Sequence, residues 1–159
     1  MDDASITAVL TDPITVDLIQ RTPLMRIAYT APDGGPRVVP LAYVMRGSDF
    51  VFCTVPSSDK VPALQQDPRV AVTIDVDQPP CCLLVRGRAS VEIVDGVPDE
   101  FIEASHRNVP AEHHDDFDAQ VRGLYDSMAR VAVTPTWVRL NDFQRTAPRA
   151  VERLVAAKS

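Results

Sequence analysis

The chain has 159 residues, of which 45% are hydrophobic and 24% are charged, and its formal net charge is −6. A chain of this size and composition is expected to fold as one globular domain over residues 1–159, burying roughly 70% of its unfolded surface. The negative charge argues against duplex nucleic acid and anionic membranes as partners, because each phosphate contact needs a basic side chain. An odd number of cysteines, two of them adjacent, and an acidic start without a signal-peptide pattern fit a reducing cytoplasm.

Turn residues and short apolar runs predict a sheet surrounded by helices. The first predicted element is a helix at Pro13–Arg21 with Asp12 as its cap. Turns at residues 33–35 and 47–49 join the first strands into an antiparallel meander, and the Gln-Pro-Pro run at 78–80 separates two later strands. The expected strands are Leu24–Thr30, Arg37–Met45, Phe50–Thr54, Arg69–Val76, Cys82–Val94 and Val131–Leu140.

Two of these strands contain a residue that predicts an irregularity. Gly87 indicates a bend in the fifth strand, and Pro135 interrupts the last one. Further helices are expected after Lys60 and at Pro98–His106, Phe117–Met128 and Ala147–Ala157. With no repeat and no linker visible, the pattern predicts one β core with helices around it.

The segment Phe50–Leu64 contains one of only two lysines in the chain. Ser57, Ser58 and Lys60 cluster in a polar turn that follows an apolar strand and precedes a short helix. Backbone N–H groups at a helix start, together with an ammonium group, form an anion site. The turn therefore predicts a phosphate site, and the alternative is an ordinary solvated lysine.

Three stretches of the sequence carry a resemblance to a known family. They are LMRIAYTAPDGGPRVVPLAYV, then FVFCTVPSSDKVPALQQDPRVAVTI, then LLVRGRASVEIV. Over about Leu24–Val94 this order resembles the pyridoxamine 5'-phosphate oxidase-like flavoproteins. The most specific parts are the Thr54, Ser58 and Lys60 positions and the Asp-Pro-Arg-Val entry to the next strand at residues 67–70.

The resemblance implies a mainly β (α+β) fold, a six-stranded antiparallel Greek-key split β-barrel with peripheral helices. It also implies a homodimer that binds FMN, or a deazaflavin as in many relatives, between its subunits. In the family a serine and a lysine hold the cofactor phosphate, a threonine approaches the flavin, and a preceding strand runs beside the ring. A tryptophan and a later arginine cover the flavin from the neighbouring subunit in the family, and here Trp137 with Arg139 or Arg145 would take that part; the alternative is a tryptophan packed at a strand end. Carried over, the cofactor-binding residues are Arg37, Val38, Val39, Pro40, Leu41, Thr54, Ser58, Lys60 and Trp137.

Three positions depart from the true oxidases of this family. Ala42 stands where they have a substrate lysine, Asp59 where an arginine precedes the phosphate lysine, and Cys82 near the place of a flavin-contacting glutamine. An acidic residue at the phosphate weakens its field. The sequence therefore predicts an FMN-dependent oxidoreductase that transfers a hydride to or from a small molecule other than pyridoxamine phosphate. The alternatives are a deazaflavin-dependent reductase and a non-enzymatic flavin- or haem-binding module.

Other chemistry-bearing residues are assigned structural roles. The Glu-His-His-Asp-Asp run at residues 112–116 lacks a zinc spacing and is predicted to be a solvated acidic loop, so no metal is expected. Cys81 and Cys82 are predicted to be buried thiols. The apolar faces of Leu24–Ala28 and Val131–Val138 are the candidate seam of the homodimer.

Overall fold

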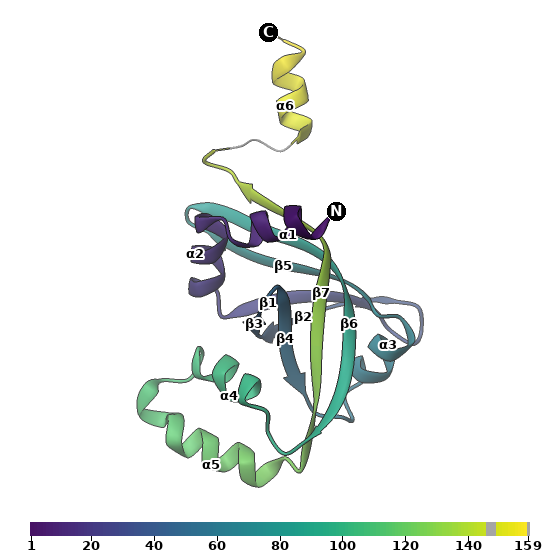
Figure 1. The fold of residues 1–159 in the computed structure, drawn as a ribbon, viewed down its shortest axis with the longest axis vertical. Helices are drawn as coiled ribbons and strands as arrows, with labels where there is room; N and C mark the ends of the chain where they lie inside the picture. Colours follow the sequence, from purple (N-terminus) through teal and green to yellow (C-terminus); the bar gives the residue numbers. More distant parts are fainter. Residues whose placement is uncertain (146–148, 159) are drawn as a thin grey trace.

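The structure, a computed structural model, describes residues 1–145 and 149–158. Within them the chain forms one antiparallel sheet of seven strands, flanked by six α-helices and one short 3₁₀ helix (Figure 1). The strands are β1 (Leu24–Thr30), β2 (Pro36–Ala42), β3 (Val44–Arg46), β4 (Asp49–Thr54), β5 (Arg69–Asp77), β6 (Pro80–Asp95) and β7 (Ser127–Asp142). The helices are α1 (Asp3–Leu10), α2 (Pro13–Arg21), α3 (Lys60–Gln66), α4 (Asp99–His106), η1 (Ala111–His113), α5 (His114–Leu124) and α6 (Arg149–Ala156).

The sheet contains one strand more than predicted because the expected strand Arg37–Met45 is broken at Tyr43. The strand order is β2-β1-β5-β6-β7-β4-β3, so β2 and β3 lie at opposite edges although they are adjacent in the chain. At Tyr43, which is fully buried, the chain leaves β1 and begins to pair with β4. The sheet thus curls around one core without closing, and the predicted antiparallel split-barrel class is confirmed with seven strands instead of six.

Arg107, just after α4, holds this break in place. Its guanidinium donates hydrogen bonds to the carbonyl oxygen of Tyr43 at 3.1 Å and to three carbonyl oxygens at the end of α2, at 2.6, 3.1 and 3.0 Å. The guanidinium also lies 5.2 Å from the centre of the Tyr43 ring. The Arg107 side chain therefore links the end of α4, the end of α2 and the strand break at Tyr43.

The long hairpin of β6 and β7 contains the predicted irregularity. Its register shifts between Arg86 and Gly87, which pair with Trp137 and Pro135, so Thr136 is the extra residue of a bulge. A Cβ at Gly87 would lie 2.7 Å from the backbone oxygen of Thr134. The predicted bend at this glycine is confirmed, and close backbone approach is its cause.

Two helix predictions need correction. The sequence predicted no element before Pro13, yet α1 begins after the capping residue Asp2 and buries Ile6 and Leu10 in the core. The helix expected at Phe117–Met128 is α5, which begins at His114 and ends at Leu124. Residues from Ser127 belong to β7 instead, because Met128 and Ala129 are buried within the sheet.

The helices occupy separate places around the sheet (Figure 1). Helices α1 and α2 lie together near one end, α4 and α5 lie together near the other, and α3 lies beside β6. Helix α6 extends away from the body of the fold, and the predicted start of this helix at Ala147 lies outside the described residues. No described helix has the length and apolar character needed to span a membrane.

Candidate functional site

The turn between β4 and α3 brings Ser58 and Lys60 together. Lys60 Nζ donates a hydrogen bond to Ser58 Oγ at 2.7 Å, and both side chains are half-buried. Backbone hydrogen bonds fix the turn, since the amide of Ser58 donates to Val55 at 3.0 Å and that of Val61 donates to Ser58 at 2.9 Å. Helix α3 has only seven residues, so the ammonium group supplies most of the positive charge here.

Thr54 and Asp59 flank this pair. Thr54 ends β4 in a half-buried position, paired with Ala129 of β7. Asp59 is exposed and stands at the cap of α3, where its side chain accepts no capping hydrogen bond. A carboxylate therefore stands next to the one ammonium group of the turn.

The side chains of β2 do not all face the same way. Val38 is 63% exposed and Pro40 is exposed as well, whereas Val39 and Leu41 pack against the main core. This alternation is the ordinary pleat of a strand. Of the four apolar residues predicted to border a cofactor ring, Val38 and Pro40 have exposed side chains. Val39 and Leu41 could contact a ring only through their backbone atoms.

Arg37 lies in a pocket of about 300 Å³ that also includes Asp59 and Pro62 of the α3 region. Its Nη2 atom forms an ion pair with Asp33 Oδ2 at 2.8 Å. A hydrogen bond from the Gly35 amide and the Arg37 guanidinium lower the pKa of Asp33. The structure thus brings Arg37 to the predicted phosphate turn, but with two carboxylates beside it.

Trp137 lies elsewhere on the sheet. It pairs with Arg86 across β6 and β7, and the Arg86 guanidinium lies 4.8 Å from the centre of its ring. Within the described residues, no hydrogen bond or ring contact joins Trp137 to the turn or to β2. Arg139 lies two residues further along β7, and Arg145 lies beyond the strand, 3.4 Å from Asp142.

The histidines form a small cluster instead of a metal site. The rings of His106 and His114 stack with centroids 3.6 Å apart, and each bonds a further acceptor, Asp118 at 2.7 Å and the Val109 carbonyl at 2.9 Å. The acidic run predicted as a loop is η1 and the first turn of α5. Among the described residues, no three metal-ligating side chains gather closely enough to hold an ion.

The cysteines lack the features of nucleophiles. Burial and the nearby Glu100 carboxylate raise the pKa of Cys53 to about 11, and burial raises that of Cys81. A thiol with a raised pKa stays protonated and unreactive at neutral pH. Cys82 is half-buried, not fully buried as predicted, and its sulfur accepts a hydrogen bond from Asn141 at 3.5 Å.

Sequence reasoning missed a second cationic region on the outward face of the sheet. Arg69 in β5 and Arg86 and Arg88 in β6 border a pocket of about 620 Å³ that reaches β1 and β7. The available signal was the Arg-Gly-Arg run at residues 86–88, because residues two apart in a strand share a face.

The family model described as pyridoxamine 5'-phosphate oxidase matches residues 12–142, which is most of the chain and includes the turn, β2 and the arginine-lined pocket. A search of curated proteins gives no match.

Several solved structures share the fold. An F420 reductase is 22% identical, covering 77% of this chain and 94% of its own, with a TM-score of 0.59. A pyridoxamine 5'-phosphate oxidase-related, FMN-binding protein from Nostoc punctiforme is 11% identical, covering 82% and 84%, with a TM-score of 0.57. The haem storage protein HutZ from Vibrio cholerae is 15% identical, covering 82% and 93%, with a TM-score of 0.58.

Proposed function

Because this chain belongs to the pyridoxamine 5'-phosphate oxidase family, we propose that it is an FMN-binding oxidoreductase acting on a small molecule. The observation that supports this most is the 2.7 Å hydrogen bond between Lys60 and Ser58 in the turn after β4. An ammonium group and a hydroxyl held together are the donors that a phosphate group needs.

The residues present fit a cofactor phosphate, with one cation fewer than the sequence suggested. Lys60 has no carboxylate ion pair among the described residues, so its charge is available to a ligand. Arg37 is already paired with Asp33, and binding a phosphate through it requires that ion pair to loosen. The turn therefore fits a phosphate through Lys60 and Ser58, with Arg37 in a secondary role.

The edge strand β2 suits the ring of a flavin. On one side it pairs with β1, and within the described sheet no strand pairs with its other side. Its outward side chains Val38 and Pro40 are apolar, and its unpaired backbone groups can meet polar ring atoms. When bound, FMN supplies hydride chemistry, while these residues bind it, orient it and exclude water.

Pyridoxamine phosphate is not the substrate in this proposal. Ala42, at the place of the family's substrate lysine, is half-buried and packs against a small cluster that includes Val44, Val51 and Ala104. No cation stands at this position to meet a substrate phosphate. We expect purified protein reconstituted with FMN to leave pyridoxamine phosphate unoxidised in an oxygen-consumption assay, and ready turnover would contradict this.

A deazaflavin is the second candidate cofactor, and it is supported by the likeness to an F420 reductase. Both cofactors carry a phosphate that the Lys60 turn can bind, so the turn alone does not choose between them. The likeness to a haem storage protein supports a third, non-enzymatic candidate, in which the fold binds a ligand without turnover.

The absorption spectrum of the purified full chain tests these candidates directly. We expect a flavin spectrum, or its restoration when FMN is added to the apoprotein, and reduction of the bound cofactor by a nicotinamide donor. Binding of deazaflavin but not FMN would replace the first candidate by the second. Binding of haem alone, or a bound flavin that no donor reduces, would favour the non-enzymatic candidate.

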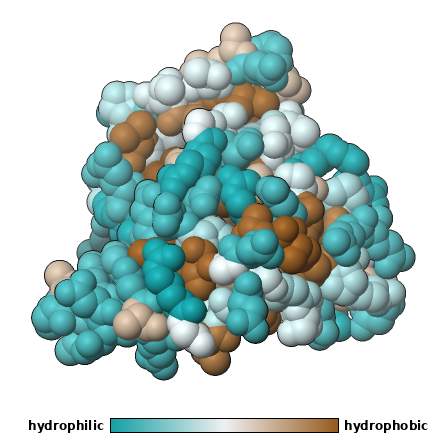
Figure 2. Space-filling view, turned by 60° about the horizontal axis from the view of Figure 1, so that its bottom comes forward, coloured by the Kyte–Doolittle hydropathy of each residue, from teal (hydrophilic) through white to brown (hydrophobic). Residues whose placement is uncertain are grey.

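We also propose a homodimer whose second subunit completes each cofactor site. Apolar residues reach the surface as separate areas within polar surroundings (Figure 2), and Leu24 at 41% and Val38 at 63% exposed belong to one region, β1 and β2. Of the two predicted seam segments, Val131–Val138 has Val131, Val133 and Val138 buried in the core of a single chain, whereas Leu24–Ala28 keeps Leu24 exposed. We therefore propose the β1 and β2 region as the seam.

A dilution series tests this assembly. If both subunits contribute to each site, cofactor and partner stabilise the same state, and cofactor should be released as the dimer dissociates. Flavin fluorescence and sedimentation measured on the same samples should change together. A monomer that retains its flavin would contradict the shared site and leave Trp137 as a packing residue against Arg86.

A further inference from the structure

Helix α6 carries an exposed apolar side. Val151, Leu154 and Val155 are spaced at i, i+3 and i+4, so they lie on one side of the helix, and they are 43%, 61% and 59% exposed. The charged residues Glu152 and Arg153 fall outside this side. An amphipathic helix of this kind normally packs its apolar side against another element.

Within the described chain, α6 stands apart from the rest of the fold. Figure 1 shows the helix beyond the end of β7, clear of the sheet and of the other helices. A helix of eight residues is also too short to be stable by itself in water, because isolated helices shorter than roughly 12–15 residues are marginal. The apolar side of α6 therefore indicates a contact with another molecule.

The two ends of the fold differ in charge. Figure 1 places α6 beyond one end of the molecule and α4 with α5 at the other. Residues 143–157, which include α6, contain three arginines and one glutamate, whereas residues 95–126, which include α4 and α5, contain nine acidic residues and two arginines. Opposite charges favour an approach of two molecules that brings such ends together. The α4–α5 end of a second copy is therefore a charge complement to the α6 end.

The α4–α5 end also exposes apolar side chains. Ile93 is 52% exposed near the end of β6, and Leu124, the last residue of α5, is 63% exposed. Both lie close in sequence to the pair Asp95 and Ser127, where the end of β6 meets the start of β7. Figure 2, turned so that this end comes forward, shows hydrophobic areas within a mostly hydrophilic surface. These side chains provide an apolar surface for α6.

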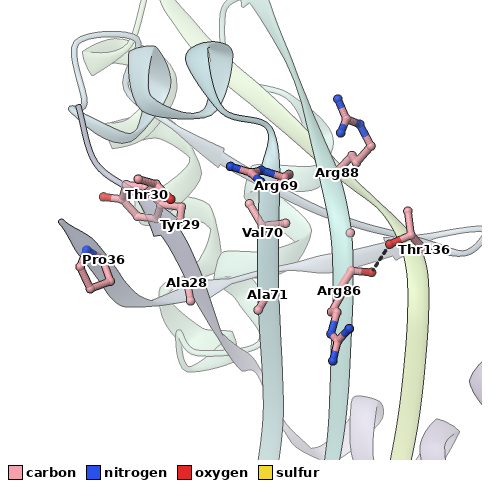
Figure 3. Close-up of a pocket in the computed structure, with 11 residues that line it drawn as sticks. Ala28, Tyr29, Thr30, Pro36, Arg69, Val70, Ala71, Arg86, Arg88 and Thr136 are labelled. Atoms are coloured by element: carbon pink, nitrogen blue, oxygen red, sulfur yellow. Dashed lines mark hydrogen bonds between the residues drawn. The ribbon is translucent and has the colours of Figure 1, made fainter. Parts of the chain in front are cut away.

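A twofold axis brings both pairs of ends together at once. The homodimer proposed above has its seam on β1 and β2, and Figure 1 shows these strands between the two ends. The pocket in Figure 3 includes Ala28 of β1 and Pro36 of β2, so it lies beside this seam and the second copy covers it. With the axis through the seam and perpendicular to the long dimension of the fold, the α6 end of each copy lies beside the α4–α5 end of the other. The contact is then made twice, and the assembly closes as a dimer.

We propose that α6 of each subunit docks on the α4–α5 end of the second copy, with Val151 and Leu154 against Ile93 and Leu124. This inference rests on the proposed homodimer and adds a contact to its β1 and β2 seam. A contact of a few side chains is small beside the roughly 1,200–2,000 Å² that a stable protein interface buries. Docking of α6 therefore strengthens the dimer and does not replace the seam.

Engineered cysteines identify the surface that α6 contacts. Full-length Leu154→Cys and Leu124→Cys are oxidised mildly, each alone and after incubation together so that subunits exchange, and are then separated on a non-reducing gel. We expect a cross-linked dimer in the mixture, and neither variant alone should exceed the wild type, whose own cysteines give the background. In the matched control mixture, Val16→Cys on the surface of α2 replaces Leu124→Cys and should give no cross-link.

Sedimentation over a dilution series measures the strength of the contact. Leu154→Asp and Leu124→Asp each place a charge in a contact that occurs twice per dimer, so each should raise the dissociation constant of the dimer about tenfold or more. Val16→Asp, at an exposed apolar residue away from both ends of the contact, should keep the wild-type value. Thermal unfolding shows that each variant is folded.

Three results would overturn the inference. A cross-link in Leu154→Cys alone would show that the two α6 helices pair with each other, and a mixture without a cross-link would show that α6 does not reach Leu124. Aspartate variants that dimerise as tightly as the wild type would also overturn it, while leaving the β1 and β2 seam in place. A wild-type chain that stays monomeric at every concentration would instead contradict the seam and the α6 contact together.

Discussion

The Lys60 turn and the arginine-lined pocket are two cationic regions built in opposite ways. In the turn, Ser58 and Lys60 lie two residues apart and bond to each other at the end of one strand. In the pocket, the cations come from β5 and β6, and the walls come from β1, β2 and β7 as well. The first region depends on local chain geometry, whereas the second depends on the register of five strands.

Each region also carries its own acidic residue. Asp59 stands beside Lys60 at the cap of α3, and Asp67 pairs with Arg69 beside the pocket. Four substitutions test this difference. Lys60→Ala removes the cation of the turn, and Gly87→Ala distorts the strands that form the pocket. Asp59→Asn and Asp67→Asn each remove the acidic residue of one region.

The largest effect is expected from Lys60→Ala. Removing one partner of a buried charged pair costs about 2–5 kcal/mol of binding free energy, so FMN affinity should fall by that amount while riboflavin affinity, which involves no phosphate, hardly changes. Isothermal titration of both ligands measures this. Lys158→Ala, at the only other lysine, is the matched control. Equal losses for FMN and riboflavin would mean that Lys60 acts through the fold.

The second effect, from Gly87→Ala, should break the pocket and spare the turn. A Cβ at this position would stand 2.7 Å from the Thr134 oxygen and 2.8 Å from Val133 Cγ1, so the β6–β7 ladder must shift. Overpacking of this kind lowers the free energy of unfolding by about 1–3 kcal/mol. Urea unfolding measures the loss, and FMN affinity should be unchanged.

Gly123→Ala is the control for that substitution. Gly123 lies in α5, and no other atom lies within 4 Å of the place that a Cβ would take, so alanine there should stabilise the helix by about 0.5–1 kcal/mol. If both alanine variants were equally stable, the close backbone approach at Gly87 would not limit that strand.

The third effect is expected from Asp59→Asn. This substitution removes a negative charge beside the predicted phosphate position without changing side-chain size. Two exposed unit charges about 4 Å apart in water interact by about 1 kcal/mol, so FMN affinity should rise by up to that amount. The rise should shrink at high salt. Asp115→Asn on the exposed face of α5 serves as control, and a fall in FMN affinity would show that Asp59 helps to form the turn.

The same contrast explains what the sequence could predict. The turn could be predicted because its strand, serine and lysine are contiguous in the sequence, and the strands before it could be predicted from the turns between them. The pocket could not be predicted, because Arg69 and Arg88 are nineteen positions apart in the chain and become neighbours only through the register of β5 and β6. The break at Tyr43 gave no signal, since an aromatic residue within a run of apolar residues is typical of an unbroken strand.

The wrong prediction of where α5 ends has a different cause. Val121 and Met128 are seven residues apart, a spacing that two helical turns also produce, and both are buried in one cluster. The chain in fact leaves the helix at Leu124 and enters β7 at Ser127. Helix α1 was missed because only Ile6 and Leu10 are buried along its length, too few to give a clear period.

The smallest effect is expected from Asp67→Asn, which removes the carboxylate that pairs with Arg69 beside the pocket. The asparagine keeps an oxygen that can accept the 3.1 Å hydrogen bond from the Arg69 amide, but it leaves the guanidinium charge uncompensated. Because the ion pair is exposed to solvent, the loss of stability should be small. The variant should also differ from wild type in acid. Asp67 has its pKa lowered from 3.8 to about 2 in the folded chain, so its stabilising contribution is present above pH 4 and is lost as the pH falls through 2. Urea midpoints should therefore differ between the two proteins at pH 5 and converge towards pH 2. Urea midpoints that differ equally at pH 5 and at pH 2 would contradict this role of the Asp67 carboxylate.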